Sequence, residues 1–139
     1  MPLEILMVED SLADVRLTKR ALAKSPNHLH VVRDGVEAIA FVKRKEPYAD
    51  APRPHLILLD LNLPRKDGRE VLAEIKGDES LRSIPVVVLT TSLAPEDVRT
   101  CYQLQANCFL NKPVDLESFT ATILAIEEFW LNRARLPPP

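Results

Sequence analysis

The sequence predicts an α/β fold: one doubly wound sheet of five parallel strands, with helices on both faces. Short apolar runs alternate five times with segments of helical periodicity. The run Leu56–Leu59 is apolar at every position, which is typical of a strand covered on both faces. The chain has 139 residues, 46% of them hydrophobic, which is enough for one core and would be cramped as two domains.

The first half of the chain predicts three strands and two helices. Ser11 and Asp14 have the spacing of a helix N-terminal cap, and Pro26 ends the helix that follows. Residues 28–32 alternate between polar and apolar side chains as an edge strand does, and three prolines within 46–54 exclude regular structure there. The expected strands are Glu4–Val8, His28–Val32 and Leu56–Leu59, and the expected helices are 12–24 and 36–45.

The second half predicts three helices and two strands. Gly68 and Gly77 bracket the first of these helices, Pro95 stands in the first turn of the second, and Asp115 caps the last. The expected helices are 69–76, 95–106 and 116–133, the expected strands are 85–89 and 107–111, and a proline-rich tail closes the chain.

The composition excludes several classes of function. A formal net charge of -2 gives no general attraction for nucleic acid, and no apolar stretch approaches the roughly 20 residues of a membrane span. Cys101 and Cys108 are interpreted as free thiols, because a chain with its own core gains little from a disulfide. We therefore expect a cytoplasmic protein that binds neither nucleic acid nor membranes.

Polar side chains end four of the five expected strands. They are Glu9 and Asp10 after the first strand, Asp60 after the third, Thr90 after the fourth and Lys112 after the fifth. The carboxyl ends of parallel strands share one edge of the sheet, where open α/β folds bind their ligands. We therefore expect three acids, a hydroxyl and an amine to lie together at that edge.

Carboxylates this close together require a compensating cation. Mg²⁺ fits best, because it takes one or two carboxylates and completes its shell with water and phosphate oxygens. The remaining partner of such a site is a phosphoryl group. Asp60 is placed to attack that group as a nucleophile, while Lys112 and Thr90 hold its oxygens. The sequence thus predicts an aspartyl phosphate that depends on Mg²⁺.

Four motifs together resemble the receiver domain of response regulators of the CheY type. They are VED at 8–10, LLDLNLPRKDG at 58–68, VLTTS at 88–92 and FLNKP at 109–113. The resemblance covers nearly the whole chain and implies a single receiver domain over residues 1–139, with its core over about 3–131. It also implies the flavodoxin-like and CheY-like strand order 2-1-3-4-5.

The resemblance implies a role for each motif residue. Asp60 matches the phosphoacceptor, Lys112 the lysine that binds the phosphoryl group, and Thr90 and Phe109 the hydroxyl and the aromatic ring that switch on phosphorylation. The metal ligands that it implies are Asp10, Asp60, the backbone carbonyl of Asn62 and, through water, Glu9.

Three further features come with the resemblance. Asn62 and Ser92 match the positions that tune the lifetime of the phosphoryl group, and a cis peptide bond is expected before Pro113. The acid pair is Glu-Asp where the family pattern is Asp-Asp. For that reason Glu9 is expected to reach the metal only through water.

Longer segments narrow the resemblance to small single-domain regulators that partner phytochrome-type histidine kinases. These segments read PYADAPRPHLILLDLNLP, GREVLAEIK and IEEFW. The implied function is a response regulator that takes a phosphoryl group from a histidine kinase onto Asp60 and signals by altered protein binding. It would be no enzyme beyond catalysing its own phosphorylation and dephosphorylation.

Two other functions are carried as alternatives. A Mg²⁺-dependent phosphatase of the haloacid-dehalogenase kind also uses a strand-end aspartate, but its signature has a second aspartate where this chain has Asn62. A scaffold that works without phosphorylation would have no need of the full motif set. A nucleotide-binding module is disfavoured because three glycines, at 35, 68 and 77, cannot build a glycine-rich phosphate loop.

The last expected helix predicts a pairing surface. At 100° per residue its apolar side chains form one stripe wide enough to face the core, made of Leu116, Phe119, Ile123, Ile126 and Trp130. Phe129 falls on a flank of that stripe with Thr122 and Ala125, where its ring would meet water in a monomer. Because receivers commonly pair through this region, we expect a homodimer that uses this face.

Overall fold

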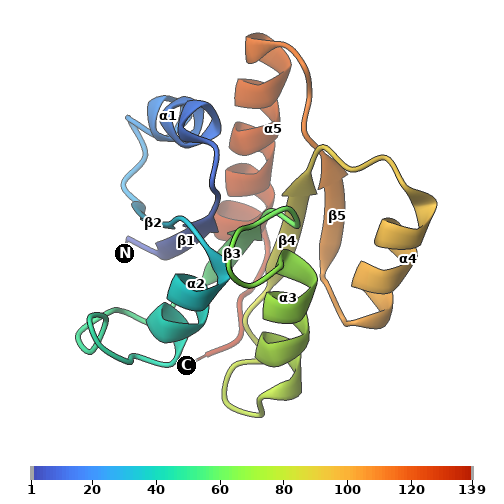
Figure 1. Ribbon diagram of the computed structural model, residues 1–139. Helices are drawn as coiled ribbons and strands as arrows, with labels where there is room; N and C mark the ends of the chain where they lie inside the picture. Colours follow the sequence, from blue (N-terminus) through green and yellow to red (C-terminus); the bar gives the residue numbers. More distant parts are fainter. Residues whose placement is uncertain (1, 139) are drawn as a thin grey trace.

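The computed structural model describes residues 2–138 and consists of one five-stranded parallel sheet between two layers of helices (Figure 1). The strands are β1 (Glu4–Val8), β2 (His28–Val32), β3 (Leu56–Leu59), β4 (Val86–Thr90) and β5 (Cys108–Asn111). The helices are α1 (Leu12–Ala21), α2 (Gly35–Val42), α3 (Gly68–Gly77), α4 (Pro95–Gln103), α5 (Leu116–Glu127) and the π-helix η1 (Glu128–Arg133). The predicted fold class is confirmed.

The strand order is β2-β1-β3-β4-β5, as the resemblance implied, so β3 lies in the middle and β2 and β5 form the edges. The register pairs Val8 of β1 with Leu59 of β3, and Leu59 with Val88 of β4. The carboxyl ends of these strands therefore reach the same edge of the sheet.

The sheet separates two hydrophobic clusters, because successive side chains of a strand point to opposite faces. Leu6, Leu59 and Val88 pack with side chains of α2, α3 and α4 on one face. Met7, Leu58 and Val87 pack with side chains of α1 and α5 on the other. Every residue of β3 is buried, which explains its unbroken apolar sequence.

Three of the predicted helix starts are confirmed. The Ser11 hydroxyl accepts a hydrogen bond from the Asp14 N–H at the start of α1, and the Asp115 carboxylate accepts one from the Ser118 N–H at the start of α5. Pro95 occupies the first turn of α4. These caps place the beginnings of α1 and α5 directly after the polar ends of β1 and β5.

Three helices end earlier than predicted. The helix predicted over 12–24 ends at Ala21 and passes into turns. The helices predicted over 36–45 and 95–106 end at Val42 and Gln103. Arg44 and Gln105 follow these two helices with φ values of 54° and 75°, and a left-handed residue at this position terminates a helix.

The last helix differs in two ways from the prediction. Its α-helical part ends at Glu127 and continues to Arg133 as η1. Leu116, expected in the core, is 61% exposed because it is the first residue of α5 and stands at the open end of the helix. Phe129 is 55% exposed, as predicted.

No helix within residues 2–138 has the length and apolar character to cross a membrane.

Candidate functional site

The carboxyl ends of β1, β3 and β5 bring three charged side chains together. Glu9 follows β1, Asp60 follows β3 and Lys112 follows β5. The Nζ atom of Lys112 lies 2.6 Å from Oε1 of Glu9 and 3.1 Å from Oδ2 of Asp60. The side chains of all three are less than a tenth exposed, so the ion pairs are protected from solvent.

A third carboxylate in this cluster was not predicted. Oδ2 of Asp14, in the first turn of α1, lies 2.8 Å from Nζ of Lys112. Nζ of Lys112 donates hydrogen bonds to Asp14 and Asp60 and forms an ion pair with Glu9, so three carboxylates surround one ammonium group. The sequence signal was the position of Asp14 in the first turn of a helix that starts immediately after the acid pair, above the same edge of the sheet.

The titration of the cluster reflects its burial and its excess of acids. Burial raises the pKa of Glu9 to about 7; the hydrogen bond from Lys112 acts against this rise and the charge of Asp60 adds to it. Burial alone would lower the pKa of Lys112, but the hydrogen bonds to Asp14 and Glu9 hold it above its usual value. Lys112 is therefore a permanent cation in the centre of the site.

Asp10 lies beside this cluster and has a different environment. Its side chain is 53% exposed, and its Oδ1 is 3.9 Å from Nη2 of Arg33, which also donates to the Asp10 carbonyl at 3.3 Å. The two oxygens of Glu9 are both engaged, because Oε1 contacts Lys112 and Oε2 accepts from the Ser11 N–H at 3.1 Å. Asp10 is thus the acid of the pair whose carboxylate is more accessible to a ligand.

The loop after β3 is held close to Asp60 by its backbone. The Asn62 N–H points toward Oδ1 of Asp60 at 3.5 Å, and the Gly68 N–H donates to the Leu61 carbonyl at 2.9 Å. A Cβ atom at Gly68 would stand 2.3 Å from the Asp60 carbonyl oxygen, so only glycine fits there. The start of α3 is therefore packed directly under the expected phosphoacceptor.

The end of β4 supplies the predicted hydroxyls. Thr90 is fully buried, its Oγ1 is 3.4 Å from the Ser92 N–H, and its carbonyl accepts from the Lys112 N–H at 2.8 Å. Phe109 is partly buried against the side of the core that α4 covers, and its N–H donates to the Tyr102 hydroxyl at 3.1 Å. Thr90 and Phe109 lie on the paired strands β4 and β5, where Thr90 is paired with Asn111 and Phe109 with Val88.

The acidic donors fit a divalent cation. Glu9 and Asp60 are buried carboxylates that share one ammonium group, and the exposed carboxylate of Asp10 follows Glu9 directly. Within residues 2–138, no three His, Cys, Asp or Glu side chains form a ready-made cage for a metal. A hard cation that keeps much of its water requires only one or two carboxylates, and oxygen donors of this kind are its usual ligands.

The expected cis bond before Pro113 is not found. The cis peptide bond within residues 2–138 is the one between Glu46 and Pro47. Lys112 reaches all three of its carboxylate partners with the bond to Pro113 in the trans form, which is the intrinsically favoured form of such a bond.

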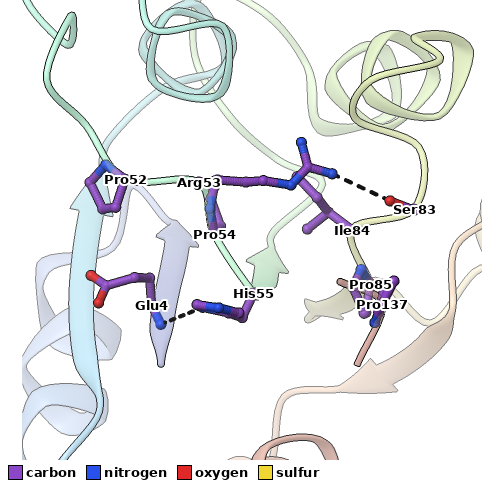
Figure 2. Close-up of a pocket in the computed structure, with 9 residues that line it drawn as sticks. All are labelled: Glu4, Pro52, Arg53, Pro54, His55, Ser83, Ile84, Pro85 and Pro137. Atoms are coloured by element: carbon purple, nitrogen blue, oxygen red, sulfur yellow. Dashed lines mark hydrogen bonds between the residues drawn. The ribbon is translucent and has the colours of Figure 1, made fainter. Parts of the chain in front are cut away.

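A pocket of about 250 Å³ lies at the amino ends of the strands, at the other end of the sheet from Asp60 (Figure 2). Four of its nine lining residues are prolines: three from the loops that precede β3 and β4, and Pro137 of the tail. The Nδ1 atom of His55 accepts from the Glu4 N–H at 2.9 Å, while His28 and His30 contact the Glu4 carboxylate. The histidines thus have structural partners at the amino ends of the strands, far along the sheet from Asp60.

Comparisons with known proteins agree with the geometry. The family model described as "Response regulator receiver domain" matches residues 5–124. Response regulator Rcp1 of Synechocystis sp. is 51% identical over 98% of this chain and 94% of its own length. The crystal structure of the phosphorylated cyanobacterial phytochrome response regulator RcpA superposes with a TM-score of 0.97 at 51% identity, covering 99% of this chain and all of that one. The Mn²⁺-bound form of Rcp1 superposes with a TM-score of 0.95 at 50% identity, again over 99% of this chain and all of the other.

Proposed function

The chain belongs to the response regulator receiver domain family, and we propose that Asp60 is the residue that carries its phosphoryl group. Receiver domains are the phosphoacceptor switches of two-component signalling. The observation that carries the assignment is the contact between Asp60 and Lys112: Asp60 is a buried carboxylate at the end of the central strand, 3.1 Å from a buried cation.

The reaction is a transfer from a phosphohistidine. An oxygen of Asp60 forms a bond to phosphorus while the bond between phosphorus and the donor imidazole nitrogen breaks; the imidazole keeps the electron pair and takes up a proton. Three carboxylates surround Nζ of Lys112 before the reaction, so we expect Lys112 to release one of them to hold a phosphoryl oxygen. Asp14 is the partner that the sequence did not anticipate and the most exposed of the three.

The family binds divalent metal, and Mg²⁺ is the ion that we propose for this chain. Its ligands would be Asp10, Asp60 and the Asn62 carbonyl, with Glu9 acting through water. The engagement of both Glu9 oxygens by Lys112 and Ser11 supports this ranking of the two acids. The bound ion would supply positive charge beside the phosphoryl oxygens.

The output that we propose is a change in protein binding. The Thr90 hydroxyl would turn toward the phosphoryl group and the Phe109 ring would occupy the space that it leaves, which alters the surface of α4 and β5. Asn62 and Ser92, which flank the site, would tune how long the phosphoryl group lasts. The chain would have no enzymatic activity beyond its own phosphorylation and dephosphorylation, and it would act in the cytoplasm as one domain, with its core over about 3–131.

The partner that delivers the phosphoryl group is proposed to be a phytochrome-type histidine kinase. The similarity to Rcp1 and to the phytochrome response regulator RcpA supports this choice. The loops and helix starts around Asp60 also expose large apolar side chains where a donor helix would have to approach. They are Leu12, Leu93, Val114 and Leu116, each a few residues from a strand end.

A second copy of the chain is the other proposed partner. A groove of about 330 Å³ runs between the edge strand β5 and the last helix, lined by Cys108, Leu110, Thr122, Ala125, Ile126, Phe129 and Trp130. The Phe129 ring packs edge-on against Trp130, with ring centroids 5.3 Å apart, and still leaves more than half of its own surface exposed. Such an apolar face favours association.

The proposed function is tested by incubation with acetyl phosphate and Mg²⁺, followed by intact-mass measurement. A receiver domain gains the mass of one phosphoryl group and retains it, whereas a phosphatase of the aspartyl-nucleophile kind releases phosphate continuously without accumulating label. A scaffold that works without phosphorylation gains nothing. Either of the last two results would replace the proposed function.

A further inference from the structure

A series of hydrogen bonds and ion pairs between polar side chains connects the loop after β4 to α3 and α4. The Ser92 hydroxyl donates to Oδ2 of Asp97 in the first turn of α4. Oδ1 of the same carboxylate accepts from two nitrogens of Arg69, Nη2 at 2.6 Å and Nε at 3.1 Å. Nη1 of Arg69 in turn contacts both oxygens of Asp67, the cap of α3, at 3.1 Å. None of these three charged residues takes part in the site described above.

These contacts can restrain the loop 91–94, which follows the switch hydroxyl of Thr90 at the end of β4. Ser92 is held at three atoms: its hydroxyl by Asp97, its carbonyl by Nδ2 of Asn111, and its N–H, at 3.4 Å, by Oγ1 of Thr90. A turn of the Thr90 hydroxyl toward Asp60 removes the last of these contacts. The contacts with Asp97 and Asn111 would then still hold Ser92 in place.

Few side chains of α4 are buried, which gives the polar connection its importance. Cys101 is the buried residue of this nine-residue helix. The side chain of Asp97 is only 20% exposed and that of Arg69 only 30%. Two nitrogens of Arg69, Nε and Nη2, donate to the same oxygen, Oδ1 of Asp97. A paired, partly buried contact of this geometry is stronger than an isolated surface ion pair.

We propose that Asp97, oriented by Arg69, is a latch that holds the loop 91–94 and the start of α4 in the unphosphorylated conformation. The proposal rests on the proposed function, because it concerns the same switch. Arg69 and Asp97 are positioning residues: they act through Ser92 and contact neither Asp60 nor Lys112. In this proposal the contacts of Asp97 break on activation, so they stabilise the resting conformation and their removal shifts the population toward the active one.

Thermodynamic linkage converts this into a measurable effect. If the active conformation alone binds a phosphoryl group well, the apparent affinity for that group is proportional to the fraction of molecules in the active conformation. Removal of the latch must then raise the apparent affinity by the factor by which it raises that fraction. The probe is beryllium trifluoride, which adds to the Asp60 carboxylate as a phosphoryl analogue in the presence of Mg²⁺. Its dissociation constant is measured by calorimetry for the wild type, Arg69→Gln, Asp97→Asn and the double variant.

We expect each single variant to bind beryllium trifluoride about fivefold more tightly, at the low end of the usual range of coupling between sites. The double variant should gain no more than either single one, because both residues act through one contact. Arg82→Gln is the matched control. It removes an arginine that pairs only at 3.9 Å with Glu79 on the surface, and it should bind as the wild type does.

The outcomes separate the latch from a merely structural role and from the proposed function. A structural role would lower the melting temperature of the variants and leave their affinity unchanged or weaker, which would overturn the latch. Additive gains in the double variant would overturn the coupling of Arg69 through Asp97. A wild type that does not bind the analogue at all would overturn the proposed function and the latch together, whereas wild-type binding with unchanged variants would overturn the latch alone. Asp97→Asn keeps the size of the side chain, so the test does not depend on a variant that leaves a cavity.

Discussion

Nζ of Lys112 lies closer to Oε1 of Glu9, at 2.6 Å, than to any oxygen of Asp60. The lysine therefore lies between the two acids and forms an ion pair with each of them. We propose that Glu9 anchors the cation, so that Asp60, in contact with it at 3.1 Å, is available to react. The pattern of strand ends placed these residues on one edge of the sheet, and this contact shows how they divide their roles.

The first prediction is that Asp60→Asn abolishes labelling by acetyl phosphate. The amide cannot act as the attacking oxygen nucleophile, while its size keeps the fold intact. Asp14→Asn is the matched control, since it removes the same charge from the same lysine at 2.8 Å. Intact mass should show one phosphoryl group on the control and none on Asp60→Asn. Label on Asp60→Asn at the wild-type rate would show that another residue is the acceptor.

The second prediction concerns the acid pair and Mg²⁺. Asp10→Ala should weaken Mg²⁺ binding by at least about tenfold, because it removes the carboxylate that is free to bind, and losses of this size follow the removal of groups at metal sites. Glu9→Gln should cost less, because both Glu9 oxygens are already engaged by Lys112 and Ser11. Calorimetric titration measures both constants, and equal losses in the two variants would contradict the ranking.

Much of the fold and of the site was predictable because the strands carry their information locally. Unbroken apolar runs identify buried parallel strands, and the polar residue that ends each run, Asp60 above all, then falls on one edge by topology alone. The contacts between side chains could not be read in this way. Asp14 meets Lys112 only through the packing of α1 on the sheet, 98 residues apart in sequence.

The helix ends were less predictable for a separate reason. Glycine is the usual sign of the left-handed residue that terminates a helix, but here Arg44 and Gln105 adopt that conformation. Neither residue type predicts positive φ, so each of the two expected helices ran on for three residues. The cis bond expected before Pro113 came from resemblance alone and had no support in the residues of this chain.

The third prediction is that Thr90→Ala separates phosphorylation from the response. Thr90 is buried and contacts the loop through the Ser92 N–H, whereas the proposed acceptor of the phosphoryl group is Asp60. The variant should gain one phosphoryl group from acetyl phosphate but show no change in self-association afterwards. Thr91→Ala, which alters the exposed neighbouring hydroxyl, is the control and should respond as the wild type does. A normal response of Thr90→Ala would remove the hydroxyl from the mechanism.

The fourth prediction is a pH effect at the packing of α2 against the loop that follows it. The Tyr48 hydroxyl donates to Oε1 of Glu37 at 2.6 Å, and this hydrogen bond, followed by burial, raises the pKa of Tyr48 to about 12. The folded-state pKa lies above the unfolded value of about 10, so the contact stabilises the fold below that pH and loses its effect as the pH rises through the folded value.

Glu37→Gln removes the negative charge and should move the titration of Tyr48 down toward its usual value. Phenolate absorbance in a Tyr102→Phe background measures Tyr48 alone, because the chain has two tyrosines. Glu79→Gln, on the exposed turn after α3, is the control. An unchanged midpoint in Glu37→Gln would mean that the hydrogen bond is not formed in solution.

The last prediction is that Phe129→Asp prevents self-association. Phe129 is 55% exposed beside the apolar groove of β5 and α5, so a charge there would be buried without a partner when two copies meet. Leu124→Asp is the matched control: Leu124 is 44% exposed and lies on a different flank of α5, with Leu116 and Thr120, so the same charge there should leave pairing unchanged. Both variants spare Phe119, Ile123 and Ile126, which form the buried stripe of the helix, and both should fold and accept phosphate.

Light scattering of the phosphorylated proteins at micromolar concentration should give a dimer for the wild type and for Leu124→Asp, and a monomer for Phe129→Asp. A wild-type monomer would exclude pairing under these conditions, and a Phe129→Asp dimer as tight as the wild type would move the interface to another face.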